Sequence, residues 1–142
     1  MAERWRRLLP GLWAGLLLCI AAIAAPAAFG ALPSAEAGQV VSRIFIREAW
    51  LSLALAALLL GLERRRPAQT GPGNVSVLWT AAGCTLLGYF AVQALMPAAR
   101  VGKGLLSFGQ LHLISMVFYG IKTLAVLLLA WRAAGLSRPP SS

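Results

Sequence analysis

The stretch from Gly109 to Trp131 reads GQLHLISMVFYGIKTLAVLLLAW, and it decides the fold class. About 20 consecutive, mostly apolar residues are enough for an α-helix to cross the ~30 Å hydrocarbon core of a bilayer. This stretch contains one lysine, Lys122, and one histidine, His112. The stretch therefore predicts a membrane-spanning helix.

Three further stretches have the same character, and they cover residues 8–29, 44–62 and 75–96. Hydrophobic residues make up 59% of the 142-residue chain, and charged residues make up 12%, about half the usual share in a soluble domain. A soluble core of this size could not bury so much apolar surface. We predict an all-α integral membrane four-helix bundle that forms a single domain over residues 1–136, followed by a disordered tail at 137–142.

The net charge of +9 comes from basic residues that flank the apolar stretches. With the N-terminus in the cytoplasm, the inner side receives Arg4, Arg6, Arg7, Arg64, Arg65, Arg66, Arg132 and Arg138. The outer side receives Arg43, Arg47, Arg100 and Lys103. Cytoplasmic flanks retain Lys and Arg, so the bias predicts that both termini are inside. A basic surface interleaved with aromatic residues is absent from the sequence, which argues against nucleic-acid binding.

Two features of the chain leave alternatives open. The N-terminal arginines and the apolar run from Leu8 resemble a signal peptide with small residues after it, but the run is longer than the usual signal core. A retained helix is the favoured prediction, and a cleaved signal is the alternative. In addition, Pro26 and Pro97 close the first and third spans in similar Pro-Ala-Ala contexts. This similarity suggests a parallel two-plus-two repeat.

Ionisable groups inside a membrane span are expensive and need a partner or a cavity. His112, Ser115, Tyr119 and Lys122 recur at helical spacing, so they form one polar stripe that should face the interior of the bundle. A second, softer stripe includes Tyr89 and Gln93 in the third span. The small residues Gly11, Gly15 and Cys19 share a face of the first span, where they would let another helix approach closely.

Glu48 and His112 each lie a few residues inside the outer end of their predicted span. We therefore expect them at similar depth in the membrane and within reach of each other. Arg47 or Gln93 would lie nearby, whereas Lys122 would be the most isolated charge. The candidate polar cluster inside the membrane therefore comprises Arg47, Glu48, Gln93, His112, Ser115, Tyr119 and Lys122. It could fix helix register, bind a proton, ion or small ligand, or hold a metal or haem through His112 and Met116.

Two sets of residues carry a resemblance to a known family. The first half contains Ala25-Pro26-x-x-Phe29-x-x-Leu32, Ala37-Gly38 and Ile44-Phe45-x-x-Glu48, and the second half contains Pro97 and Phe108-x-x-x-His112-x-x-Ser115. Together they resemble the bacterial membrane domain of unknown function 4149, which is related to the eukaryotic transmembrane protein 205.

The resemblance implies a four-helix, all-α membrane domain without an established reaction. It also implies that Pro26, Phe29, Phe45, His112 and Ser115 are positions of the family pattern. An Asn expected shortly after Ser115 is not evident, because Tyr119 and Gly120 stand there.

The sequence favours a non-catalytic multi-pass protein of the bacterial inner membrane. It would be an accessory subunit or a small transporter-like component, with the lipid bilayer and either a second copy or a larger membrane complex as partners. We expect no cofactor. The alternative is a metal- or haem-binding protein that uses His112 with Met116, Met96 or Glu48. An enzyme is disfavoured because the chain contains no Asp, no phosphate-binding loop and no Ser-His-Asp set.

Overall fold

The computed structural model describes residues 2–65 and 73–135, and its regular structure there is entirely helical. The predicted tail at 137–142 and much of the linker between the second and third spans lie outside these residues. The described helices are α1 (Ala2–Cys19), η1 (Ile20–Ala24), α2 (Ala25–Ala31), α3 (Ser34–Arg64), α4 (Asn74–Thr85), η3 (Leu86–Ala91), α5 (Val92–Arg100) and α6 (Phe108–Gly135).

Four continuous helical stretches of the described chain are long and apolar enough to cross a membrane. They are Glu3–Ala31, Ser34–Arg64, Asn74–Ala99 and Phe108–Gly135. The all-α, four-span prediction is therefore confirmed. The helices extend past the predicted apolar spans, most of all in α3, which begins at Ser34 whereas the predicted span begins at residue 44.

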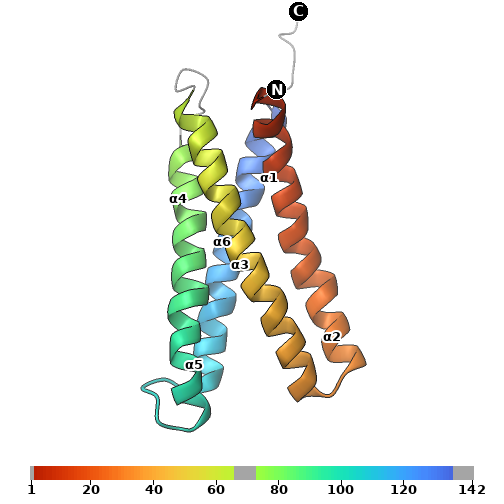
Figure 1. Ribbon diagram of the computed structural model, residues 1–142, viewed down its shortest axis with the longest axis vertical. Helices are drawn as coiled ribbons and strands as arrows, with labels where there is room; N and C mark the ends of the chain where they lie inside the picture. The colour runs from red at the N-terminus through yellow and green to blue at the C-terminus, as the bar shows by residue number, and fades with distance from the viewer. Residues whose placement is uncertain (1, 66–72, 136–142) are drawn as a thin grey trace, which may run out of the picture.

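The four spans alternate in direction and form a bundle in which α1 packs on α3, α3 on α4, α4 on α6, and α6 on α1 (Figure 1). The start of α1, the end of α3, the start of α4 and the end of α6 lie at the same end of the bundle. We call this the basic end, because it carries Arg4, Arg6, Arg7, Arg64, Arg65 and Arg132. Because the number of crossings is even, the two ends of the described chain lie on the same side of the membrane. That this side is the cytoplasm stays a prediction from the distribution of Lys and Arg.

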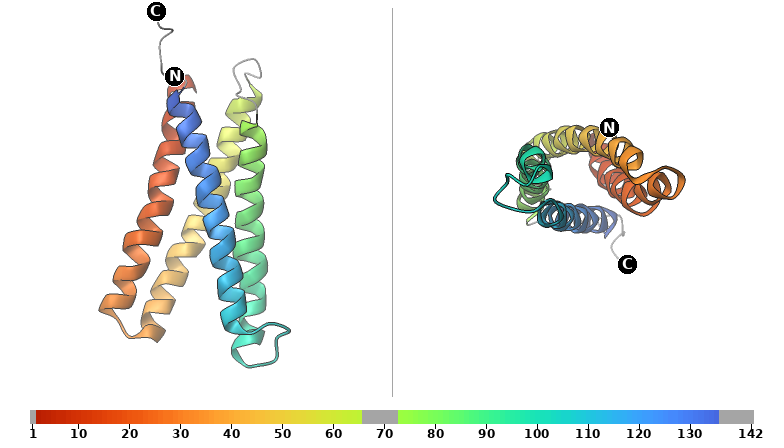
Figure 2. Two further views of the ribbon diagram at one scale, coloured as in Figure 1. Left: turned by 180° about the vertical axis from the view of Figure 1, so that it is seen from behind. Right: turned by 90° about the horizontal axis from the view of Figure 1, so that it is seen from below.

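The main hydrophobic core lies in the half of the bundle next to the basic end. Its central side chains come from all four spans and include Trp13, Leu17, Leu59, Leu78, Val126 and Leu129. Toward the opposite end the hairpin of α2 and α3 diverges from that of α5 and α6, as both side views show (Figures 1 and 2). Accordingly, α2 contains no buried residue, and a smaller cluster of Val92, Met96, Ala99 and Leu111 joins α5 to α6.

The first and third spans each contain a π-helical turn, η1 and η3, before a proline. Such turns are rare inside helices and often coincide with sites where a helix must bend or accept an outside hydrogen bond. The turns do not occupy equivalent positions, since η1 ends at Ala24 next to Pro26, whereas η3 ends at Ala91 well before Pro97. The parallel repeat therefore stays a prediction.

The connection between α5 and α6 has its backbone fixed at both ends. At the end of α5, the N–H groups of Gly102 and Lys103 donate to the carbonyls of Ala99 and Ala98 at 3.3 and 2.9 Å. Gly102 has a φ of +70°, so this is a Schellman cap, in which glycine adopts the left-handed conformation without strain. Ser107 and Gln110 then form a capping box at the start of α6, through bonds of 2.9 and 3.3 Å.

Candidate functional site

A buried ion pair joins α3 to α6 near the middle of both helices. The ammonium group of Lys122 donates to the two carboxylate oxygens of Glu48 at 2.8 and 2.9 Å. Their side chains are only 4% and 2% exposed. Charges that are shielded from water are tolerated when they are paired and hydrogen-bonded, and this contact satisfies both conditions.

Two further side chains extend this pair to α1. The hydroxyl of Ser52, one helical turn after Glu48, donates a hydrogen bond to the Glu48 carboxylate. The indole N–H of Trp13 in turn donates to Ser52 Oγ at 2.9 Å. Every buried side-chain nitrogen and oxygen of residues 2–65 and 73–135 has a hydrogen-bond partner. We call Trp13, Glu48, Ser52 and Lys122 the polar centre.

The polar stripe of α6 reaches a different helix from each of three positions. Ser115 donates to the carbonyl of Gly88 in η3 at 2.9 Å, and Tyr119 donates to the carbonyl of Leu17 in α1 at 2.9 Å. Lys122 then reaches α3. The prediction that this stripe faces the interior is confirmed for these three residues. Each of these polar groups forms its hydrogen bond with a neighbouring span and does not face a cavity.

The ring of Tyr119 also contributes to the surroundings of the ion pair. Lys122 Nζ lies 4.7 Å from the centre of this ring, a distance at which a cation is attracted to the aromatic face. On another side the ring packs edge-on against Phe45 of α3, with the two centres 5.2 Å apart. Tyr119 thus contacts α1 through its hydroxyl and α3 through its ring.

His112 does not join the stripe, and the expectation that it lies at the depth of Glu48 and within its reach is wrong. His112 is exposed and stacks on Phe108, with ring centres 6.3 Å apart. The ten residues from His112 to Lys122 correspond to about 15 Å along α6, so Glu48 cannot be level with both. Because α3 begins at Ser34, Glu48 lies deeper than the predicted span placed it, and there it meets Lys122. The expectation that Lys122 is isolated is therefore also wrong.

The remaining candidates lie apart from the polar centre. Arg47 is exposed, Gln93 is half-buried, Met116 is 58% exposed and Met96 is buried. Within the described chain, groups of three or more His, Cys, Asp or Glu placed to hold a metal ion are absent. Glu48 is engaged by Lys122, so the metal-binding alternative is left with His112 and the methionines Met116 and Met96, and it stays a prediction.

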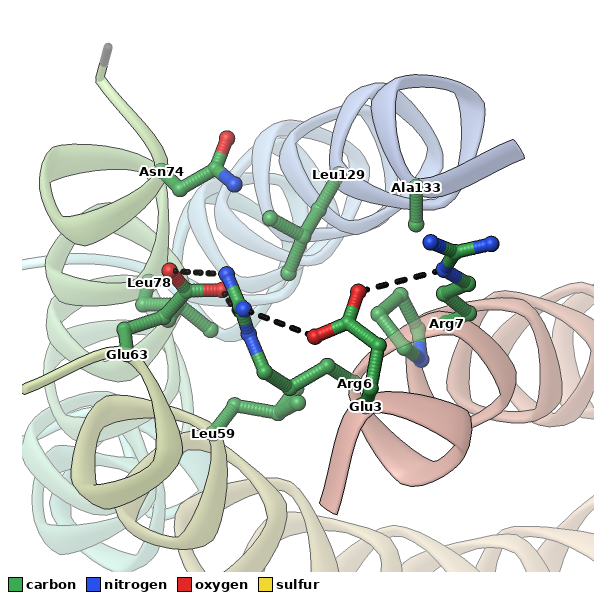
Figure 3. Close-up of a pocket in the computed structure, with 10 residues that line it drawn as sticks. Glu3, Arg6, Arg7, Leu59, Glu63, Asn74, Leu78, Leu129 and Ala133 are labelled. Atoms are coloured by element: carbon green, nitrogen blue, oxygen red, sulfur yellow. Dashed lines mark hydrogen bonds and ion pairs between the residues drawn. The ribbon is translucent and has the colours of Figure 1, made fainter. Parts of the chain in front are cut away.

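A second ionic cluster closes the basic end, and sequence reasoning missed it. Arg6 of α1 donates to both carboxylate oxygens of Glu63 in α3 at 3.2 and 2.9 Å, and to Glu3 at 3.0 Å (Figure 3). Arg7 pairs with the same Glu3 at 3.1 Å. These four side chains line a small pocket together with Asn74, Leu59 and Leu129. Two acids face two bases there, so the cluster ties helix ends together without a surplus of charge.

The partners Arg6 and Glu63 are 57 residues apart, and local spacing gives no signal for such a pair. The small-residue row of α1 was also misplaced. Gly11, Gly15 and Cys19 are exposed, and a Cβ atom added at either glycine would meet no atom within 4 Å. The row therefore faces away from the bundle, and α1 packs through its opposite face, which carries Trp13 and Leu17.

Comparison with known families places the chain. A family model, that of the domain of unknown function 4149, matches residues 8–103. This range includes Pro26, Phe29 and Phe45, and it ends before Phe108, His112 and Ser115. It also includes three of the four members of the polar centre, Trp13, Glu48 and Ser52. The resemblance of that last segment stays a prediction. No curated protein and no solved structure matches the chain. Because the match covers more than half of the residues, the chain belongs to the family of the domain of unknown function 4149.

Proposed function

We propose that this chain is a non-catalytic multi-pass protein of the bacterial inner membrane, which serves as an accessory subunit or a small transporter-like component of a larger assembly. The observation that supports this proposal is the polar centre. Its ionisable groups bind each other between α3 and α6 and do not line an open cavity. A substrate would have to displace one partner of a buried pair, which is strongly unfavourable.

The polar centre is suited to specifying which helices pack together. Apolar side chains alone discriminate poorly between helices in lipid, because the lipid tails are equally apolar. Hydrogen bonds from Lys122, Tyr119 and Ser115 select α3, α1 and η3 as the neighbours of α6. A bundle with a fixed arrangement of this kind presents a defined outer surface to other membrane proteins.

The test is the native mass of the affinity-purified protein in a mild detergent. An accessory subunit is expected to elute as an assembly much larger than its own 15.0 kDa plus the detergent micelle. The same preparation in a harsh detergent is the control and should release the single chain. A protein that is monomeric and free of partners in the mild detergent, extracted directly from its native membrane, contradicts the proposal.

A further inference from the structure

Arg47 lies at the depth of the polar centre but on the outside of the bundle. It precedes Glu48, whose partner Lys122 lies near the middle of α6, about 20 Å from either end of that helix. Glu48 is buried, whereas Arg47 is exposed. Within residues 2–65 and 73–135, Arg47 has no hydrogen-bond or ion-pair partner.

A guanidinium group in this position is costly in a plain bilayer. An Arg at the centre of a membrane helix opposes insertion, because its charge must leave water. Long basic side chains near helix ends lower this cost by reaching the headgroups. Arg47 begins far from an end of α3, which continues to Ser34 on one side and to Arg64 on the other. A carboxylate on a neighbouring helix would offset the cost directly.

The surface around Arg47 has the shape that helix docking needs. Residues on the same side of α3 recur at intervals of three and four, within an arc of about 80°. From Arg43 to Gly61 these residues are exposed, and they are Arg43, Arg47, Trp50, Ala54, Ala57 and Gly61. We call this the Arg47 face. Its half toward the basic end carries only small side chains, and a Cβ added at Gly61 would meet nothing within 4 Å. Small residues allow two membrane helices to approach closely.

A second copy of the chain cannot supply the carboxylate. The chain has only four acidic residues. Glu3, Glu48 and Glu63 are held in ion pairs, and Glu36 lies in the first turn of α3, about 16 Å along the axis from Arg47. If the counter-charge is an acidic side chain, it therefore comes from a different protein.

We propose that the Arg47 face binds a transmembrane helix of another protein, and that this helix carries an Asp or Glu side chain near mid-membrane. The inference rests on the proposed role as an accessory subunit and names the kind of partner. The carboxylate pairs with the guanidinium of Arg47, while the partner helix packs against Ala54, Ala57 and Gly61.

The first test uses a defined helix and needs no knowledge of the natural partner. The full-length protein is reconstituted in phosphatidylcholine vesicles with a synthetic Leu/Ala membrane helix that carries one central Glu, and association is measured by fluorescence energy transfer. We expect this helix to bind about fivefold more tightly than its Gln counterpart. The preference for the Glu helix should vanish in Arg47→Leu. It should persist in the control Arg43→Leu, because Arg43 lies one turn closer to the start of α3. Arg47→Glu should instead prefer a helix with a central Lys.

Equal binding of the Glu and Gln helices by the wild-type protein overturns the proposal, because Arg47 is then accommodated by lipid alone. A preference that survives Arg47→Leu also overturns it. Ala54→Phe should weaken binding by blocking close approach, whereas Ala94→Phe, on an exposed site of α5, is the matched control. Since Arg47 forms no hydrogen bond or ion pair with another described residue, Arg47→Leu should keep wild-type helical content by circular dichroism.

The native assembly then separates this inference from the proposed function. If the wild-type protein is large in mild detergent and Arg47→Leu elutes as a monomer, both proposals are supported. If both proteins are equally large, the accessory role stands and the Arg47 face is not the contact. If the wild-type protein is itself monomeric, the accessory role fails, and binding of the synthetic Glu helix alone decides whether the face recognises a carboxylate.

Discussion

Lys122 and Glu48 show how much a single contact can matter in a membrane bundle. The sequence predicts that Lys122 faces inward, because it shares a helical face with Ser115 and Tyr119. The partner was not predictable, since 74 residues separate Glu48 from Lys122. Their relative depth depends on where α3 begins, and the apolar pattern starts well after Ser34.

Removal of the Lys122 charge should strongly destabilise the bundle. Lys122→Met leaves a buried carboxylate without its counter-ion, and we expect a loss of about 3–5 kcal/mol in the free energy of unfolding. The measurement is unfolding in mixed micelles followed by circular dichroism. Lys103→Met is the matched control, because Lys103 is exposed and should change stability by about 0.5 kcal/mol or less. In Glu48→Gln/Lys122→Met most of the loss should be recovered. Wild-type stability in the single variant would contradict a structural role for the pair.

The indole N–H of Trp13 should contribute a smaller, separable amount. Trp13→Phe keeps an aromatic ring in a site that is 1% exposed, but it removes the donor to Ser52. We expect a loss of about 1 kcal/mol for the hydrogen bond, with a further loss from the smaller ring. Trp131→Phe is the control, since Trp131 is 80% exposed. If the two variants lost the same stability, the bond to Ser52 would carry no weight.

At the scale of the elements, α6 is the helix that organises the others. Its three inward polar side chains were predictable from spacing, but two of their acceptors are backbone carbonyls in or beside π-helical turns. A change from α- to π-helical bonding has no reliable signature in the sequence. The exposed position of His112 was not foreseen either. Helical periodicity shows which residues share a face of α6, but it does not show how far along the helix the other spans cover that face.

Gly88 is the element-scale position most sensitive to added volume. A Cβ atom built there would lie 2.3 Å from Phe118 Cβ of α6, a separation that forces the two helices apart. We expect Gly88→Ala to cost about 1–3 kcal/mol and to weaken the bond from Ser115 to the Gly88 carbonyl. Gly83→Ala in the same span is the control, because nothing lies within 4 Å of its added Cβ. Thermal unfolding in detergent measures both, and equal midpoints would show that η3 adapts.

At the scale of the whole molecule, the bundle is tied at one end and in the middle, and it diverges at the other end. Length and hydropathy were sufficient to predict four spans, since each exceeds the thickness of the hydrocarbon core. The order of neighbours and the divergence were not predictable. They depend on pairs such as Arg6 with Glu63 and Tyr119 with the Leu17 carbonyl, which join distant parts of the chain.

This asymmetry predicts an order of local opening. Backbone amides of α2, which has no buried residue, should exchange with deuterium well before those of α1 around Trp13 and Leu17. Mass spectrometry of detergent-solubilised protein resolves the two segments, which belong to one span and share the same micelle. Arg6→Gln should accelerate exchange in α1 while leaving α2 unchanged. Uniform protection along the span would show that the diverging end is as firmly held as the core.

The position of α6 at the end of the described chain has a consequence for synthesis. Glu48 leaves the ribosome 74 residues before Lys122, which at ordinary translation speeds is roughly 4 to 15 s. The carbonyls of Leu17 and Gly88 likewise lack their α6 donors until Tyr119 and Ser115 have been made. Until α6 is made, the Glu48 carboxyl lacks Lys122, so we expect the nascent chain to hold it beside a polar surface of the insertion machinery. A message truncated before α6 should thus yield a three-helix product in which the Glu48 carboxyl lacks its partner.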